Sequence, residues 1–225
     1  MKFVSVAIAA SLLASTPALA ENFAGPRVDV RLGLDATSIK LAQEYQEIVD
    51  GDVDYEDSYR DSRTETGFVY GLGLGYDINA GKNFVVGVEA NLDFASTKQC
   101  DGYDDYRSCL KAGRDIELAV RGGVIVNPNT LLYAKLGYAN GRFKAIDVID
   151  GEKTTLGKNR DGLRVGAGVE TTLTSNLYLK VEYSYTDYKD WKYTDTGSRE
   201  YYDWRVDSKL GFDRHKVVAG LGYRF

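Results

Sequence analysis

Few residues in this 225-residue chain are suited to catalysis. His215 is the single histidine, and it could act as a general base beside a serine or a carboxylate. The nearest candidates, Ser184 and Glu182, fall on the polar face of a predicted strand, whereas His215 falls on the apolar face of the next strand. Because opposite faces cannot share a hydrogen-bonded triad, we expect no enzymatic activity.

Cys100 and Cys109 are the only cysteines. In a chain that crosses an oxidising compartment, a disulfide is the default, and closing this small ring contributes about 2 to 3 kcal/mol in a chain-entropy estimate. The spacing is not Cys-x-x-Cys, so it does not indicate redox chemistry. Two cysteines and His215 do not readily supply the four ligands of a zinc site.

Asp50, Asp52 and Asp54 have the spacing that opens a calcium loop. The pattern then fails, because Tyr55 stands where glycine is required and Asp61 stands in place of the bidentate glutamate. A solvated acidic run is the simpler interpretation. We therefore predict no metal and no cofactor.

Apolar and polar residues alternate with a period of two in eight segments, which predicts eight β-strands. These strands and their connections must position the residues described above. Polar connections, 38–66, 95–113, 142–161 and 187–212, alternate strictly with short turns at 79–82, 127–130 and 175–176. This order predicts an all-β fold, an eight-stranded antiparallel up-and-down barrel with its tight turns at one end. The segments are 27–37, 67–78, 84–94, 115–126, 132–139, 163–173, 177–186 and 213–225.

Period two alone does not say which face of the barrel is outside. A secreted lipocalin-like barrel would turn its apolar face inward. The position of the glycines favours a transmembrane barrel. The polar faces carry many glycines, which make room for charged neighbours inside a narrow lumen. Aromatic residues near both ends of an aliphatic band predict two membrane girdles. They are Tyr76, Phe84, Tyr223 and Phe225 at one end, and Phe68, Tyr70, Phe94, Tyr138 and Tyr185 at the other.

The inward face of this barrel carries nearly balanced charges. In a lumen only wide enough for its own side chains, they are expected to pair and plug it, and the alternative is the selectivity lining of a pore. The predicted network consists of Arg31, Asp35, Glu89, Asp93, Asp115, Glu117, Arg121, Lys135, Arg164, Glu170, Lys180, Glu182, Lys216 and Arg224.

The amino terminus has the pattern of a secretory signal peptide: Lys2, an apolar run to Ala14, and an Ala-x-Ala site at residues 18–20. We therefore predict a signal peptide over 1–20 and a barrel domain over 21–225. Loss of Lys2 takes the formal charge from −5 to −6, with 27 basic against 33 acidic residues. A mildly acidic chain makes nucleic acid an improbable partner.

The carboxyl terminus, with Gly220, Tyr223 and Phe225, resembles the signal by which Gram-negative outer-membrane barrels are recognised for insertion, although Val218 departs from it. Together with the signal peptide, residues 132–138 (LYAKLGY), Arg214-His215 and 217–225, this ending resembles the opacity-protein, porin-like family of small outer-membrane barrels, and more distantly the OmpA transmembrane domain. The resemblance implies a monomer in the outer membrane, in contact with lipid and lipopolysaccharide and inserted by the barrel-assembly machinery.

The function expected from this pattern is structural and interactive, with four polar loops displayed outside the cell. The fourth loop is rich in aromatic residues, which suit either contact with a surface ligand or extension of the barrel wall: Tyr188, Trp191, Tyr193, Tyr201, Tyr202 and Trp204. The alternative is a narrow porin-like channel for ions or small solutes.

Overall fold

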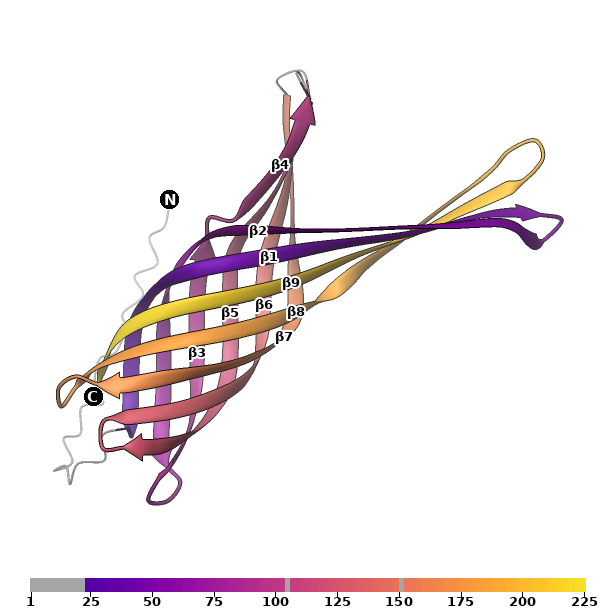
Figure 1. The fold of residues 1–225 in the computed structure, drawn as a ribbon. Coiled ribbons are helices and arrows are strands. Elements are labelled where there is room, and N and C mark those ends of the chain that lie inside the picture. The colour runs from indigo at the N-terminus through magenta and orange to yellow at the C-terminus, as the bar shows by residue number, and fades with distance from the viewer. Residues whose placement is uncertain (1–22, 104–105, 150–151) are drawn as a thin grey trace, which may run out of the picture.

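The computed structural model describes residues 23–103, 106–149 and 152–225, and the predicted signal peptide lies outside these ranges. Nine antiparallel strands make up the fold (Figure 1). Within the described ranges, no helix is long and apolar enough to cross a membrane. The strands are β1 (Gly25–Val49), β2 (Asp52–Asn79), β3 (Phe84–Ala95), β4 (Lys98–Tyr103), β5 (Tyr106–Asn127), β6 (Thr130–Ile149), β7 (Glu152–Thr172), β8 (Leu177–Ser198) and β9 (Asp203–Arg224).

The nine strands form a ring with eight positions. Neighbours follow the order β3-β2-β1-β9-β8-β7-β6-β5-β4, and β3 also pairs with β5, which closes the sheet. β3 and β4 both pair with β5, one after the other, and only Ser96 and Thr97 separate them. They therefore occupy one position in the ring. The predicted eight-stranded antiparallel barrel is confirmed.

The alternation of faces is also confirmed. Leu32 exposes 69% of its surface on the outside, whereas the adjacent Arg31 exposes 4% in the lumen. Glycines on the inner face leave room for charged side chains: a Cβ on Gly87 would lie 2.0 Å from a carboxylate oxygen of Asp77. The apolar face is therefore outside, which rules out a soluble barrel with an apolar interior.

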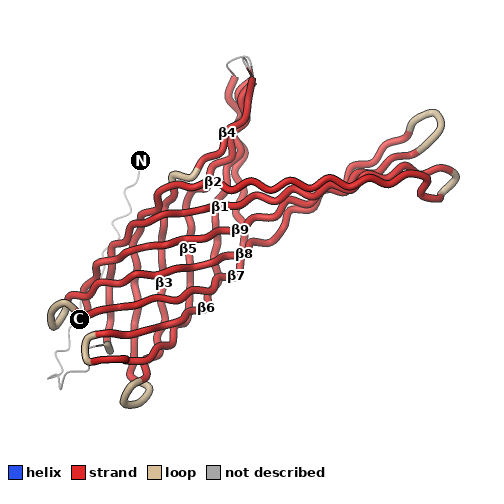
Figure 2. Tube along the Cα trace, in the orientation of Figure 1, coloured by secondary structure: helices blue, strands red, loops and turns tan. Residues whose placement is uncertain are grey.

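The four long connections are not loops, which corrects the prediction. Each continues as paired strands beyond the aromatic girdle, and the described tips of the β1–β2 and β8–β9 hairpins are the short connections 50–51 and 199–202 (Figure 2). Asp50 and Gly51 both have positive φ, 53° and 91°, as in a tight two-residue hairpin turn. Outside the membrane both faces of a strand can carry polar residues, so the period-two signal weakens there although the backbone keeps its ladder.

These hairpins are arranged as two arms (Figure 1). Pairing between β7 and β8 stops at Gly162 and Tyr188, and pairing between β2 and β3 stops at Val69 and Ala95. Beyond these points the sheet divides. The first arm comprises the outer parts of β2, β1, β9 and β8 (residues 38–66 and 189–212), and the second arm those of β4, β5, β6 and β7 (described residues within 98–112 and 142–161).

Candidate functional site

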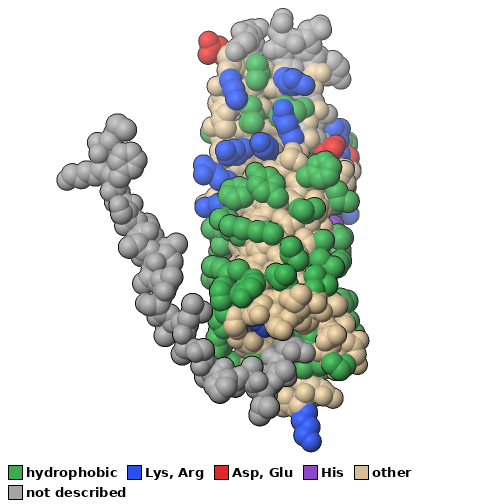
Figure 3. Space-filling view, turned by 90° about the vertical axis from the view of Figure 1, so that its left-hand side faces the viewer, with side chains coloured by type: hydrophobic (Ala, Val, Ile, Leu, Met, Phe, Trp, Pro, Cys, Tyr) green, Lys and Arg blue, Asp and Glu red, His purple; other side chains and the backbone are tan. Residues whose placement is uncertain are grey.

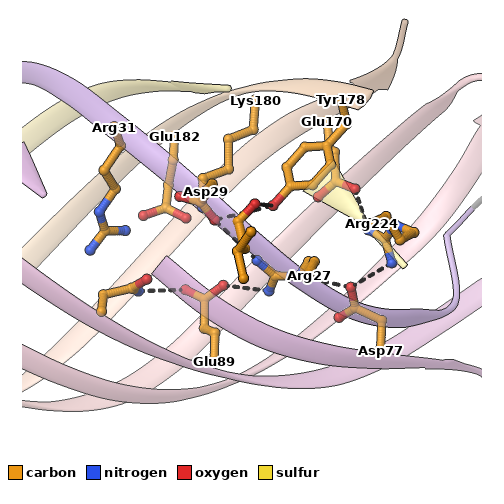
Figure 4. Close-up of polar contacts among 12 residues, drawn as sticks. Arg27, Asp29, Arg31, Asp77, Glu89, Glu170, Tyr178, Lys180, Glu182 and Arg224 are labelled. Atoms are coloured by element: carbon orange, nitrogen blue, oxygen red, sulfur yellow. Dashed lines mark hydrogen bonds and ion pairs between the residues drawn. The ribbon is translucent and has the colours of Figure 1, made fainter. Parts of the chain in front are cut away.

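The short-turn end of the lumen is organised around Asp77 on β2. Its carboxylate accepts from Arg27 Nε at 2.9 Å, Arg121 Nη2 at 2.5 Å and Arg224 Nη1 at 3.0 Å. Glu170 pairs with Arg121 at 2.9 Å. It also pairs with Arg224 at 2.5 Å (Figure 4). Two carboxylates from β2 and β7 thus bind arginines from β1, β5 and β9 across the lumen.

In the middle of the lumen, Lys135 on β6 is surrounded by three carboxylates. Its Nζ lies 2.9 Å from Glu89, 2.8 Å from Glu117 and 2.7 Å from Glu182, which come from β3, β5 and β8. All of these side chains are at most 2% exposed, so the ions are desolvated, and Arg27 and Arg164 add positive charge beside Glu89 and Glu117. Nearby, Lys180 on β8 pairs with Asp29 on β1 at 2.9 Å (Figure 4).

Towards the arms, Asp115 is the shared acceptor. Arg164 Nη2 lies 2.5 Å from it and Lys216 Nζ lies 2.7 Å from it. Lys216 also binds Asp93 at 2.6 Å, and Arg31 binds the other oxygen of Asp93 at 2.8 Å. Arg214 on β9 pairs with Asp35 on β1 and also lies 3.7 Å from Asp115. The charges thus form one nearly continuous ladder from end to end.

Apolar clusters close both ends of this ladder. At the arm end, six buried residues pack together, and the ring of Phe143 lies 5.3 Å from that of Tyr188 and 4.9 Å from that of Phe212. At the short-turn end, Phe23, Val85, Leu131 and Tyr133 form a second cluster. Tyr188 links the upper cluster to the charges, since its hydroxyl donates to Asp115 at 3.0 Å.

The structure brings together every residue of the predicted lumen network, all buried. It adds Arg27, Asp29, Asp77 and Arg214, which the predicted network omitted. These four lie on the polar faces of their strands, so the alternation itself carried the signal that could have found them.

His215 lies on the outer surface of β9, as predicted. A hydrogen bond of 2.8 Å joins its Nδ1 to the Tyr183 hydroxyl, and its ring lies 4.9 Å from that of Tyr185. Ser184 and Glu182 are buried in the lumen. The structure therefore places His215 in the aromatic girdle rather than in a triad.

The predicted insertion residues lie at the end of β9. Tyr223 and Phe225 point outward with their rings 4.9 Å apart, and Gly220 faces the lumen beside Lys180. Recognition by an assembly machinery remains a prediction.

Cys100 and Cys109 form a disulfide across the β4–β5 hairpin, in the second arm. Asp50, Asp52 and Asp54 are exposed at the tip of the first arm. Among the residues with described positions, no cluster of three or more His, Cys, Asp or Glu side chains could hold a metal ion.

The first arm carries aromatic side chains on the face that continues the lumen side of its strands. Tyr45 and Tyr55 contact edge to face at 6.4 Å, and a hydrogen bond to Glu47 raises the pKa of Tyr45 to about 12. Trp191 is 41% exposed and accepts a cation–π contact from Lys158 of the second arm at 3.9 Å. Tyr188 corrects the prediction for the fourth loop, because it is 1% exposed and packs inside the barrel against Phe143.

Comparison with known proteins agrees with this architecture. Residues 6–225 match the family model described as "Outer membrane protein beta-barrel domain". The chain is 34% identical to the 25 kDa outer-membrane immunogenic protein of Brucella canis, over 65% of this chain and 63% of that one. It is 33% identical to the 22 kDa outer membrane protein of Rhizobium leguminosarum bv. viciae, over 69% of this chain and 67% of that one.

Among solved structures, Ail of Yersinia pestis matches with 18% identity and a TM-score of 0.40, covering 86% of this chain and 99% of that one. OprG of Pseudomonas aeruginosa matches with 18% identity and a TM-score of 0.42, covering 90% and 96%. The assignment rests on the family model and on the closed ring of strands. The chain belongs to the outer membrane protein beta-barrel domain family, and its location is the outer membrane.

Proposed function

We propose that this protein is a non-conducting scaffold of the outer membrane that displays two β-arms outside the cell. The observation that carries the proposal is the filled lumen. Buried ion pairs span it, and apolar clusters close it at both ends. An eight-stranded barrel is only about wide enough for its own side chains, so these pairs leave little room for a solute path.

The arms supply the surface for interaction. On the first arm, Tyr55, Tyr59, Trp191 and Tyr193 are each between 41% and 59% exposed on one face. Exposed aromatics on a rigid sheet make contact surfaces with little loss of side-chain entropy. The relatives from Brucella are named outer-membrane immunogenic proteins, which fits segments that stand free of the membrane.

The orientation can be tested with a short epitope tag at two turns that have open surroundings. A Cβ at Gly51, in the tip of the first arm, or at Gly81, in a short turn, would meet no atom within 4 Å. We expect antibody to label the Gly51 tag on intact cells and the Gly81 tag only after permeabilisation. The opposite labelling would overturn the proposed orientation.

Tryptophan fluorescence can report binding at the first arm, because Trp191 and Trp204 are the only tryptophans in the sequence and both lie on this arm. We expect a glycan array to retain the folded protein and the bound glycan to shift its tryptophan emission. A variant with Tyr55, Tyr59 and Tyr193 replaced by serine should lose retention, while a control with Glu44, Glu56 and Arg60 replaced by serine keeps it. Equal retention of both variants would remove the aromatic face from the proposal.

A narrow channel is the second candidate. It is favoured by several buried polar atoms in the described lumen that have no hydrogen-bond partner, among them Arg27 Nη1, Asp29 Oδ1, Arg31 Nη2 and Asn91 Oδ1. A file of water beside these atoms would be the start of a conducting path. Conductance distinguishes the two candidates.

A further inference from the structure

The outer face of the second arm carries a row of like charges. Lys98 on β4 stands opposite Lys111 on β5, and Lys111 stands opposite Lys144 on β6. Like charges directly opposite one another destabilise a sheet, so three lysines in one cross-strand row have an energetic cost in the isolated protein. An anion bound across the row would remove that cost.

Two arginines extend this row down to the membrane. Arg114 stands opposite Phe94, a residue of the aromatic girdle, and Arg142 lies four residues beyond the girdle residue Tyr138. Lys98, Lys111, Lys144, Arg114 and Arg142 are termed the basic row below. Figure 3 shows lysine and arginine side chains directly above the hydrophobic band on one side of the molecule. This is the height of lipid headgroups beside a barrel.

Within the described residues, three cations of the first arm have carboxylate partners, unlike those of the basic row. On the first arm, Lys209 pairs with Asp190 at 2.8 Å, Arg205 pairs with Asp207 at 2.7 Å, and Lys40 pairs with Asp213. In the basic row, no cation forms an ion pair with a carboxylate whose position is described. Arg114 donates one bond to Asn140 at 3.1 Å, and its Nε is buried without an acceptor in the described structure.

We propose that the basic row binds the phosphate groups of an anionic lipid in the outer leaflet. Lysines offer point charges to such groups, and arginines offer paired N–H donors with the right spacing. Arg114, opposite the girdle residue Phe94, puts the lower end of the row beside the headgroup layer. The inference goes beyond the proposed function, since it assigns a lipid site on the second arm; it shares only the outward orientation, which the Gly51 tag tests separately.

The test compares two triple variants that each lose three positive charges. K98Q/K111Q/K144Q removes the lysines of the basic row. The control, K40Q/K192Q/K209Q, removes lysines from the outer face of the first arm, where Lys209 lies six residues from His215, as Lys144 lies six from Tyr138. Both are refolded in an uncharged maltoside detergent, and only protein with the folded gel mobility is titrated with lipid A.

The expected result is a loss of lipid A affinity on the order of a hundredfold at low salt for K98Q/K111Q/K144Q, and wild-type affinity for the control. Dephosphorylated lipid A should bind all three proteins equally weakly. Equal affinity of both variants for lipid A would overturn the proposal. Tight binding of inorganic pyrophosphate by the wild type would also overturn it, because the row would then be a site for soluble anions.

Discussion

Replacing Asp77 with asparagine tests whether the lumen is held by compensated charge. The amide keeps the shape of the side chain and removes one negative charge from between Arg27, Arg121 and Arg224. Before the change, these three arginines face the carboxylates of Asp77, Glu89 and Glu170. After it, the three guanidinium groups, which cannot lose their protons, keep Glu170 and the carboxylates of Glu89 and Asp29, which also neutralise Lys135 and Lys180.

The structure sets the size of the effect. One positive charge is left uncompensated in a site where the side chains of Arg27, Asp77 and Glu170 are fully buried. Breaking a buried pair by removing one partner costs about 3 to 5 kcal/mol. A second variant, D77N/R224M, removes one positive charge together with the negative one and so restores the net charge of the wild-type site; we therefore expect it to regain much of the lost stability.

The assay is equilibrium unfolding in urea of protein refolded in lipid vesicles, with the folded fraction read from gel mobility without boiling. Asp207→Asn serves as the control, because Asp207 pairs with Arg205 on the exposed surface of the first arm, and its replacement should leave the unfolding midpoint unchanged. A loss below about 1 kcal/mol for Asp77→Asn, the size expected of an exposed ion pair, would refute the reasoning.

Three further changes have distinct expected outcomes. Gly33→Ala should prevent closure of the barrel, because its Cβ would lie 1.9 Å from the Val217 carbonyl oxygen, and Gly122→Ala, with open space around it, should fold normally on the same gel. Replacing Cys100 and Cys109 with serine should leave insertion intact but speed proteolysis of the second arm, since the disulfide there contributes about 2 to 3 kcal/mol to a local hairpin; unchanged cleavage would contradict this. Burial and the neighbouring carboxylates of Asp213 and Asp190 raise the pKa of Asp187, so the folded state binds this proton more tightly than the unfolded state, and stability falls as pH rises through the raised pKa. Asp187→Asn should therefore be more stable than wild type at neutral pH, with a gap that closes as pH falls towards the unfolded pKa; a gap independent of pH would argue against the assignment.

The barrel could be predicted from sequence because lipid and lumen impose opposite demands on alternate residues. Leu32 and Arg31 are neighbours with opposite exposures, and the same contrast recurs around the ring. The burial of the charged side chains on the inner face was also predictable, because a small closed barrel encloses every side chain that points inward.

The arms could not be predicted in the same way. Beyond the girdle, water meets both faces of the sheet, so polar side chains are equally suited to either face. Lys40 and Glu44 lie on one face, and Tyr45 and Glu47 lie on the other. The pattern there has no strict period although the strands continue. Tyr188 did carry a signal, because it falls two residues beyond Thr186 on the inward face of β8.

Partner choice within the lumen was also beyond the sequence. Alternation places Lys135 inside, but the approach of Glu89, Glu117 and Glu182 to it depends on the stagger of four strands. The same holds for Arg224 beside Asp77: Arg27 lies on the paired strand β1, but Arg224 on β9 reaches Asp77 only once β1 and β9 pair and close the ring.

Single-channel conductance in a planar lipid bilayer tests the central claim most directly. The wild-type protein, refolded without its first 20 residues, should give no stable current steps, because the ion pairs and both apolar clusters fill the lumen. A variant with Glu117 and Arg121 replaced by alanine removes two lumen side chains and should conduct. Stable steps from the wild type would contradict the sealed scaffold and establish the channel in its place.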